Sequence, residues 1–417
     1  MKTPLFALII VTSIATTLLT ATAHAQTVRF ATFNTAFSDA FGVDASGRLA
    51  SSLATETFTH ARVIAETIQR TRPDVILLNE FDTDLSGASY TSFQENYLSV
   101  SQNGADPIRF DHVYVAPSNT GVASGVDLDN NNRVTGPGDA FGFGNYEGEF
   151  GMVVLSKFPI ATDNVRTFQE FLWKDMPDNA LPTEFYSAEA QEVFRLSSKS
   201  HWDVPIQVGD ETVHLLAAHP TPPVFDGPED RNGRRNHDEI RLFADYVTPE
   251  NSDYIYDDAG VTGGLAAGEK FVIVGDYNAD PFDGDSFESA ANLFLEHPLI
   301  NNSMTPASDG AVEDSTTEGS RNNTHTGDPS FDTSDFNPST VGNLRVDYAL
   351  ASQTLELVDT AVFWPEQSSE LGQRLTPNFP NSISDHRLVW VDVVVPEPSG
   401  WPLTLVAFVA LLFARNW

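Results

Sequence analysis

The stretch Phe271–Pro281, with the sequence FVIVGDYNADP, runs from four apolar residues into a dense group of Gly, Asp and Asn residues. A short apolar run that ends in turn-forming residues is typical of a buried β-strand. Asp276 and Asn278 directly follow this strand, where α/β folds commonly place their functional groups. A single polar residue after a strand is more often ordinary turn chemistry, so the interpretation depends on the rest of the chain.

Four other segments carry acidic, amide or imidazole residues at or beside an expected strand. They are Phe30–Asn34 (FATFN), Val75–Glu80 (VILLNE), Leu215–Pro220 (LLAAHP) and Ser384–His386 (SDH). An Asp-His pair or a lone Asn has a simple structural explanation at any one of these places. Their joint occurrence, in order along the chain, indicates one shared site.

Short apolar runs alternate with a few helical patterns through the middle of the chain. Helical spacing appears in Thr57–Arg70 and His237–Tyr246. The many strands and few helices predict two packed sheets with helices outside. The stretches Gly121–Gly148 and Asn301–Thr340 are polar and predicted to be loops. Strands are expected at Val28–Phe33, Val75–Leu78, Met152–Leu155, Val213–Ala217, Phe271–Val274, Val346–Leu350 and Leu388–Val395.

These motifs resemble the endonuclease/exonuclease/phosphatase superfamily over about residues 28–394. The most specific matches are Gly275–Asp280 (GDYNAD), Arg345–Tyr348 (RVDY) and Ser384–His386. The runs His219–Pro223 and Asp226–Asn236 are similar to a secreted bacterial branch. The resemblance implies an α/β fold of the deoxyribonuclease kind, a four-layer α/β/β/α sandwich in a single domain.

The resemblance also implies a metal site built from oxygen ligands. Glu80 would be the principal metal-binding carboxylate, with Asn34 beside it, and Asp385 would touch the metal or its waters. Oxygen ligands suit a hard cation such as Mg²⁺, with Mn²⁺ or Ca²⁺ as alternatives. The chain has no cysteine, so thiolate ligands and disulfides are excluded.

The remaining matched residues would carry out phosphoester hydrolysis. His386 would contact the scissile phosphate or act as general base, oriented by Asp347. Asp276 would align or deprotonate the attacking water, and Asn278 would donate a hydrogen bond to a phosphate oxygen. His219 would be a second phosphate ligand. Whether the histidine or the aspartate takes the proton stays open at this stage.

A basic patch stands out in this acidic chain. Arg231, Arg234 and Arg235 lie together, and arginine side chains match phosphate oxygens bidentately, so the patch is a candidate substrate-binding element. Pairing with neighbouring Asp and Glu residues explains the arginines equally well.

Oxygen-bearing side chains alternate at Asp127, Asp129 and Asn131, as at the start of many calcium loops. Position twelve of that pattern is Gly138 instead of Glu, although Asp139 follows directly. The loop is therefore a candidate structural Ca²⁺ site, with a flexible polar loop as the alternative.

The charge balance bears on the substrate. The 417 residues include 58 acidic and 23 basic side chains, for a formal net charge of −35. Such a field disfavours tight binding to nucleic acid, so a phosphatase or phosphodiesterase acting on small substrates is favoured over an extracellular nuclease. A non-catalytic, acidic, calcium-binding surface protein is the alternative of another class.

The two ends are predicted to be targeting segments. Residues 1–25 have a basic start, an apolar run and a small-x-small site at Ala23-His24-Ala25, as in a signal peptide. Residues 395–417 resemble the PEP-CTERM tails of Gram-negative bacteria, which implies processing by an exosortase-type enzyme. A simple membrane anchor is the alternative for this tail. Residues 26–394 would form the catalytic domain of an exported, secreted or surface-anchored protein that meets the membrane only through its tail.

Overall fold

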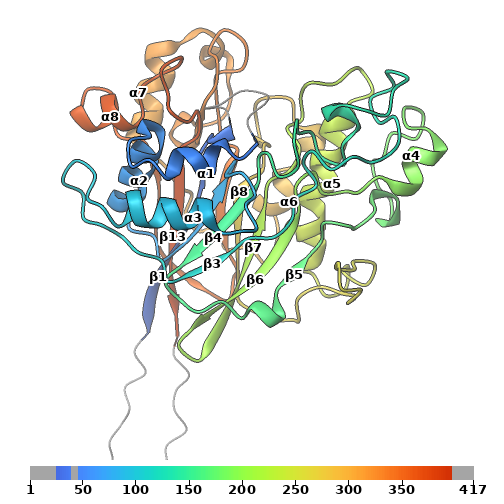
Figure 1. Cartoon of the computed structure of the whole chain (residues 1–417), viewed down its shortest axis with the longest axis horizontal. Helices are drawn as coiled ribbons and strands as arrows, with labels where there is room; N and C mark the ends of the chain where they lie inside the picture. Colours follow the sequence, from blue (N-terminus) through green and yellow to red (C-terminus); the bar gives the residue numbers. More distant parts are fainter. Residues whose placement is uncertain (1–24, 39–45, 397–417) are drawn as a thin grey trace, which may run out of the picture.

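The computed structural model describes residues 25–38 and 46–396 (Figure 1). The predicted signal peptide and sorting tail therefore lie almost wholly outside the described residues. None of the helices within the described ranges is long and apolar enough to cross a membrane.

Two β-sheets form the centre of the molecule. The six-stranded sheet has the order β12-β13-β1-β2-β4-β3, and the five-stranded sheet has the order β11-β8-β7-β6-β5. The first comprises β12 (Glu356–Phe363), β13 (Leu388–Val395), β1 (Gln26–Asn34), β2 (Val75–Asn79), β4 (Met152–Ser156) and β3 (His112–Tyr114). The second comprises β11 (Asp347–Ala351), β8 (Phe271–Asp276), β7 (Glu211–Ala218), β6 (His201–Val208) and β5 (Arg166–Thr167). A separate two-stranded sheet joins β9 (Ser334–Asp335) to β10 (Asn343–Leu344).

Helices cover the outer faces of the two large sheets (Figure 1). The helices are α1 (Arg48–Leu53), α2 (Thr59–Thr71), α3 (Ala88–Phe93), α4 (Ala188–Val193), α5 (Arg231–Tyr246), α6 (Asn292–Leu295), α7 (Asp309–Glu318) and α8 (Glu370–Leu375). A short π-helix, Gln94–Leu98, continues α3, and 3-10 turns occur at Pro137–Asp139, Thr162–Asn164, Trp173–Asp175, Phe287–Ser289, Ser320–Thr324 and Pro329–Phe331.

Three hydrophobic cores separate the four layers. Strand β2 shows why, because successive side chains of a strand point to opposite faces. Val75 and Leu77 belong to the core between the two sheets, whereas Ile76 and Leu78 belong to the core beneath α2 and α3. The third core lies between the five-stranded sheet and α5. The predicted four-layer α/β/β/α sandwich is confirmed.

The parts of the fold that the sequence did not predict have polar or interrupted patterns. Residues 301–340 were predicted to be a loop, which is wrong because they contain α7, two 3-10 turns and β9. The N-terminus of α7 is capped by Ser308, whose side chain accepts a hydrogen bond from Ala311 N. Strand β6 also escaped prediction, since Asp203 and Pro205 interrupt its apolar residues.

The aromatic-rich sequence of Phe168–Trp173 (FQEFLW) is compatible with an exposed apolar hairpin or with a buried helix. Its aromatic side chains Phe168, Phe171 and Trp173 are buried in the core beneath α5, so they form no exposed hairpin. The segment is not a helix either, because only a short 3-10 turn begins at Trp173.

The registers and the packing of the two large sheets bring the ends of strands from both sheets to one edge of the sandwich. Parallel β1 and β2 place Asn34 opposite Asn79, one residue before Glu80. Parallel β7 and β8 end at Ala218 and Asp276, so His219 lies beside this edge. Antiparallel β11 places Asp347 opposite Asp276. The predicted site residues carried by these strands therefore lie together at this edge.

Candidate active site

The carboxylate of Asp276 lies at the centre of the site. It is almost fully buried, and its Oδ2 atom accepts a hydrogen bond from Asn34 Nδ2 at 3.0 Å. The same oxygen lies 3.5 Å from His219 Nε2 and 3.6 Å from His386 Nε2. One carboxylate oxygen therefore contacts groups carried by β1, by the loop after β7 and by the segment before β13.

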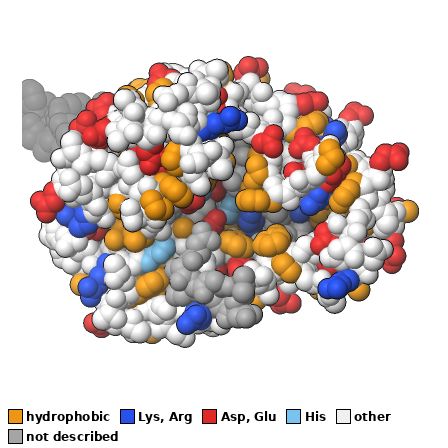
Figure 2. Space-filling view, turned by 90° about the horizontal axis from the view of Figure 1, so that it is seen from above, with side chains coloured by type: hydrophobic (Ala, Val, Ile, Leu, Met, Phe, Trp, Pro, Cys, Tyr) orange, Lys and Arg blue, Asp and Glu red, His pale blue; other side chains and the backbone are white. Residues whose placement is uncertain are grey.

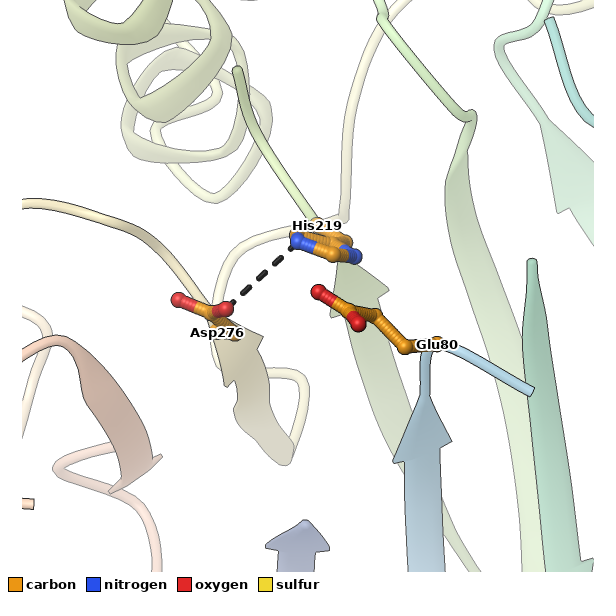
Figure 3. A group of neighbouring side chains, drawn as sticks. All are labelled: Glu80, His219 and Asp276. Atoms are coloured by element: carbon orange, nitrogen blue, oxygen red, sulfur yellow. Dashed lines mark ion pairs between the residues drawn. The ribbon is translucent and has the colours of Figure 1, made fainter. Parts of the chain in front are cut away.

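Two backbone features hold this arrangement together. A Cβ atom at Gly275 would lie 2.1 Å from Ala218 O on β7, so only glycine permits this close approach of the strands. Glu80 has a φ of 55°, a conformation that non-glycine residues seldom adopt and that is common at functional sites. The turn at Glu80 directs its carboxylate toward His219 and Asp276 (Figure 3).

Glu80, His219 and Asp276 together fit a metal ion. Each offers one ligand atom, and these atoms lie within 4.8 Å of one another (Figure 3). Burial, and then the charges of Lys199 and His386, lower the pKa of His219 well below its usual value. A neutral imidazole can act as a metal ligand. His219 Nδ1 is also buried without a hydrogen-bond partner among the described residues.

Asn34 and Asp385, the other predicted metal ligands, have different surroundings. The Asn34 side chain donates from Nδ2 to Glu80 Oε1 at 3.0 Å, and its Oδ1 accepts from Ala36 N. The amide nitrogen of Asn34 therefore donates to both the Glu80 and the Asp276 carboxylates. Asp385 is more exposed, with Oδ1 3.8 Å from His386 Nε2.

His386 and Asp347 form the buried pair that the sequence predicted. His386 Nδ1 and Asp347 Oδ2 are 2.9 Å apart, and Thr333 Oγ1 donates to the same oxygen at 2.9 Å. Burial raises the pKa of Asp347 to about 6, against the opposing charge of His386. Burial disfavours the imidazolium of His386, but the carboxylates of Asp347 and Asp276 outweigh it and raise the pKa of His386 well above its usual value.

Asn278 lies beside the site on a turn with φ 53°. Its backbone nitrogen donates to Asp276 Oδ1 at 3.0 Å, and its Nδ2 donates to Pro220 O at 3.2 Å. These bonds tie the Asp276 turn to the loop that carries His219. The predicted contact of Asn278 with phosphate stays a prediction.

The structure adds two residues that the sequence did not single out as part of the site. Lys199 is buried just before β6 and interacts electrostatically with Glu239, Glu80 and Asp276; burial lowers its pKa, against those carboxylates. Glu239, from α5, accepts from Ser198 N at 2.6 Å and from Thr221 N at 2.7 Å. Glu239 therefore holds in place both the residue before Lys199 and the loop that follows His219. Lys199 was missed because β6, the strand that follows it, was not predicted.

The three predicted substrate-binding arginines have internal partners. Arg231 pairs with Glu229 and stacks on Phe185. Arg234 donates to Glu229 O at 3.1 Å and lies over the ring of Phe287. Their role toward substrate stays a prediction.

Arg235 is the buried member of the three. It donates to three backbone carbonyls, Leu196 O at 2.8 Å, Phe141 O at 2.6 Å and Arg195 O at 3.0 Å. Replacing Arg234 and replacing Arg235 are therefore expected to have different effects.

Replacing Arg235 by alanine is expected to destabilise the protein, because each lost hydrogen bond from a charged group contributes about 1.5–3 kcal/mol. Arg234→Ala is the matched control and is expected to leave the free energy of unfolding nearly unchanged while raising KM. Chemical denaturation and steady-state kinetics measure the two effects. An unchanged KM for every phosphoester tried in Arg234→Ala would remove its substrate-binding role.

The predicted calcium loop also brings its acidic side chains close together. Asp127 and Asp129 both accept a hydrogen bond from Asn131 N at 3.1 Å, and Asp139 joins them in a group whose ligand atoms lie within 4.8 Å of one another. Asp139 Oδ2 is buried without a partner among the described residues.

Seen from above, the active-site face has a hollow with histidine and acidic side chains inside it (Figure 2). A family model described as "Endonuclease/Exonuclease/phosphatase family" matches residues 31–386, most of the chain. The chain belongs to this family. Members of the endonuclease/exonuclease/phosphatase family are metal-dependent phosphoester hydrolases, in agreement with the buried carboxylate and imidazole groups.

The chain is similar to several solved structures at low identity. An endonuclease/exonuclease/phosphatase from Beutenbergia cavernae is 16% identical, with a TM-score of 0.46 over 88% of this chain and 72% of that one. A family protein from Leptotrichia buccalis is 12% identical, with a TM-score of 0.44 over 88% and 99% of the two chains. Sphingomyelinase C from Streptomyces griseocarneus is 14% identical, with a TM-score of 0.44 over 88% and 99%. No curated protein matches the sequence. These similarities are too remote to carry an argument about the substrate.

Proposed function

We propose that the protein is an exported, divalent-metal-dependent hydrolase of small phosphoesters. The observation that carries this proposal is the arrangement around Asp276 Oδ2. Glu80 and His219 lie on one side of it as candidate metal ligands, and the imidazole of His386, held by Asp347, lies 3.6 Å away on the other. Metal-binding and proton-handling groups thus meet at one point.

The described residues fit a metal, because Glu80 and His219 each offer a ligand atom within 4.8 Å of the other and of the Asp276 carboxylate, and His219 Nδ1 is unpartnered within the described chain. Asp385 would contact the metal or its waters. When bound, a divalent ion supplies Lewis-acid polarisation and lowers the pKa of a bound water. Mg²⁺ is the proposed ion, with Mn²⁺ and Ca²⁺ as alternatives.

The protein's own groups position the substrate and its proton. Asp347 fixes the ring of His386, so that Nε2 is the atom left to face the phosphate. Since its raised pKa favours the imidazolium, we assign His386 to charge stabilisation at a phosphate oxygen. Asp276 then aligns the attacking water and accepts its proton. Asn34 keeps Asp276 and Glu80 in place through its bridging amide.

The substrate is proposed to be small because the formal net charge of −35 opposes the approach of a polyanion. An extracellular nuclease is the second candidate within the same chemistry. A non-catalytic calcium-binding surface protein would tolerate loss of site residues, whereas here the catalytic groups form one connected, buried network.

A panel assay on the purified mature domain tests the proposal. It compares p-nitrophenyl phosphate, its bis ester, plasmid DNA, phytate and sphingomyelin, each with Mg²⁺, Mn²⁺ and Ca²⁺. Turnover of a small ester is expected to exceed that of plasmid DNA. Preferred cleavage of DNA would favour the nuclease assignment. The absence of turnover with every ester and every metal would refute the proposed hydrolase function.

Export and surface attachment belong to the same proposal. Gln26 pairs with Val395 at one end of the sheet, whereas Asn34 and His386 lie at the other. The eight residues of β13 span about 26 Å at roughly 3.3 Å per residue, so a tail processed by an exosortase-type enzyme would hold the active site away from the membrane. The N-terminal residue of the exported protein, read by mass spectrometry, tests cleavage before Gln26.

We also propose a structural Ca²⁺ in the loop that contains Asp127, Asp129 and Asn131, with Asp139 as a further ligand. Titration calorimetry of the Asp127→Ala/Asp129→Ala double variant is expected to show one fewer Ca²⁺ bound per chain than wild type, because two of the carboxylate ligands are removed. The same calcium heat in both proteins would remove this site.

A further inference from the structure

A second group of buried acids lies outside the active site, on α7 and β9. Asp314, Glu318 and Asp335 each offer a carboxylate oxygen, and these atoms lie within 4.8 Å of one another. Asp314 and Asp335 have no solvent exposure, and Glu318 is partly exposed. Two ligands of one Ca²⁺ ion, each at about 2.3–2.6 Å, are separated by at most about 5 Å, so this spacing fits a single ion.

A neutral amide points into the same group. Asn343, on β10, has no solvent exposure, and its Nδ2 donates to Asp314 Oδ2 at 2.9 Å. Its Oδ1 has no hydrogen-bond partner among the described residues. The opposite orientation of the amide would bring two acceptor oxygens together, so the observed one is the favourable one. The amide group that contacts Asp314 thus leaves its own oxygen buried and unpartnered within the described chain.

The carboxylates are left unsatisfied in the same way. Asp314 Oδ1, Asp335 Oδ1 and Glu318 Oε2 are all buried without a hydrogen-bond partner in the described part of the chain. Buried acceptors without donors cost free energy, and buried carboxylates cost more. Four unsatisfied oxygens from three elements therefore indicate a missing positive partner.

The local charge balance leads to the same conclusion. Arg387 is the neighbouring cation, and its Nη2 lies 3.1 Å from Asp335 Oδ2, the oxygen that is already partnered. Three carboxylates against one guanidinium would leave two negative charges, which one divalent cation would neutralise.

We propose that Asp314, Glu318, Asp335 and the amide oxygen of Asn343 bind a structural divalent cation, with Ca²⁺ as the best match. All of these ligands are oxygen atoms, which hard cations prefer, and waters from the exposed side of Glu318 would complete the shell. The site is separate from Glu80 and from the loop at Asp127.

The ion would also support the active site. Asp335 N donates to Asp385 O at 2.7 Å, and Arg387 N donates to Thr333 O at 2.7 Å. Thr333 in turn bonds Asp347. A cation that fixes Asp335 therefore steadies the segment that presents Asp385 and His386, which makes Asp314 and Glu318 positioning residues.

The test is metal stoichiometry and thermal stability in the mature chain. A background with Glu80→Gln, Asp127→Asn and Asp129→Asn removes carboxylates from the other two sites. In this background Ca²⁺ is expected to raise Tm by roughly 3–6 °C at a hundred times Kd. Adding Glu318→Gln is expected to abolish the shift and to lower bound Ca²⁺, measured by mass spectrometry of the metal, by one per chain.

The behaviour in chelator separates a metal site from a purely structural cluster. Without metal, Glu318→Gln removes a repelled charge, so its Tm in chelator is expected to equal or exceed that of the background protein. Asp309→Asn, an exposed acid on the same helix, is the control and should keep the calcium shift. Asp314→Asn provides a second variant if Glu318→Gln folds poorly. The proposal is overturned if the background shows no shift with Ca²⁺, Mg²⁺ or Mn²⁺, or if Glu318→Gln or Asp314→Asn keeps the shift.

Discussion

His386→Ala is expected to lower kcat for phosphoester hydrolysis by about a hundred- to a thousandfold, the usual range for the loss of a donor that stabilises charge in the transition state. The variant removes the imidazole whose Nε2 lies 3.6 Å from Asp276 Oδ2 and leaves Asp347 buried without its partner. Steady-state kinetics at saturating metal measures the effect.

Asp347→Asn is the matched variant for this prediction. It retains the shape of the side chain but removes the charge that holds the His386 ring, so kcat is expected to fall with little change in KM. Full activity in both variants would show that the catalytic imidazole is elsewhere. A loss of folding, seen by circular dichroism, has to be excluded first because the pair is buried.

Glu80→Gln is expected to weaken the affinity for the activating metal by at least about a hundredfold, since even residues that only support a metal ligand change affinity by about 10–100-fold. The amide retains the size of the side chain and its hydrogen bond with Asn34 but lacks the charge. Activity measured across a metal titration gives the apparent metal affinity. Glu147→Gln, a change at an exposed acid, is the control and should match wild type.

An unchanged metal response in Glu80→Gln would move the metal to another set of ligands. In that case Asp276, Asp347 and His386 would be the next candidate group among the described residues.

The central strands and the grouping of the candidate site residues could be predicted because their signals are local. Strands β1, β2, β7 and β8 each contain a short apolar segment, and Asn34, Glu80, His219 and Asp276 directly follow or end these strands. Parallel pairing places β1 beside β2 in one sheet and β7 beside β8 in the other, and the packing of the two sheets then brings the strand ends together. Asp347 and His386 were predicted through their family motifs, and their 2.9 Å contact is a tertiary fact that no local pattern contains.

The parts that escaped prediction depend on long-range contacts. Lys199 is buried among Glu239, Glu80 and Asp276, which come from three distant segments. The polar helix α7 has no apolar periodicity, so the buried position of Asp314 becomes evident only when β9 and β10 pack beside it. In each case polar residues are buried against each other instead of against an apolar core.

The most direct test of the central claim is turnover of bis-p-nitrophenyl phosphate and p-nitrophenyl phosphate by chelator-treated protein before and after metal is restored. The account predicts no turnover in chelator, recovery with Mg²⁺ or Mn²⁺ in wild type, and no recovery under the same conditions in Glu80→Gln or His386→Ala. Undiminished turnover in chelator, or equal recovery in the two variants, would contradict it.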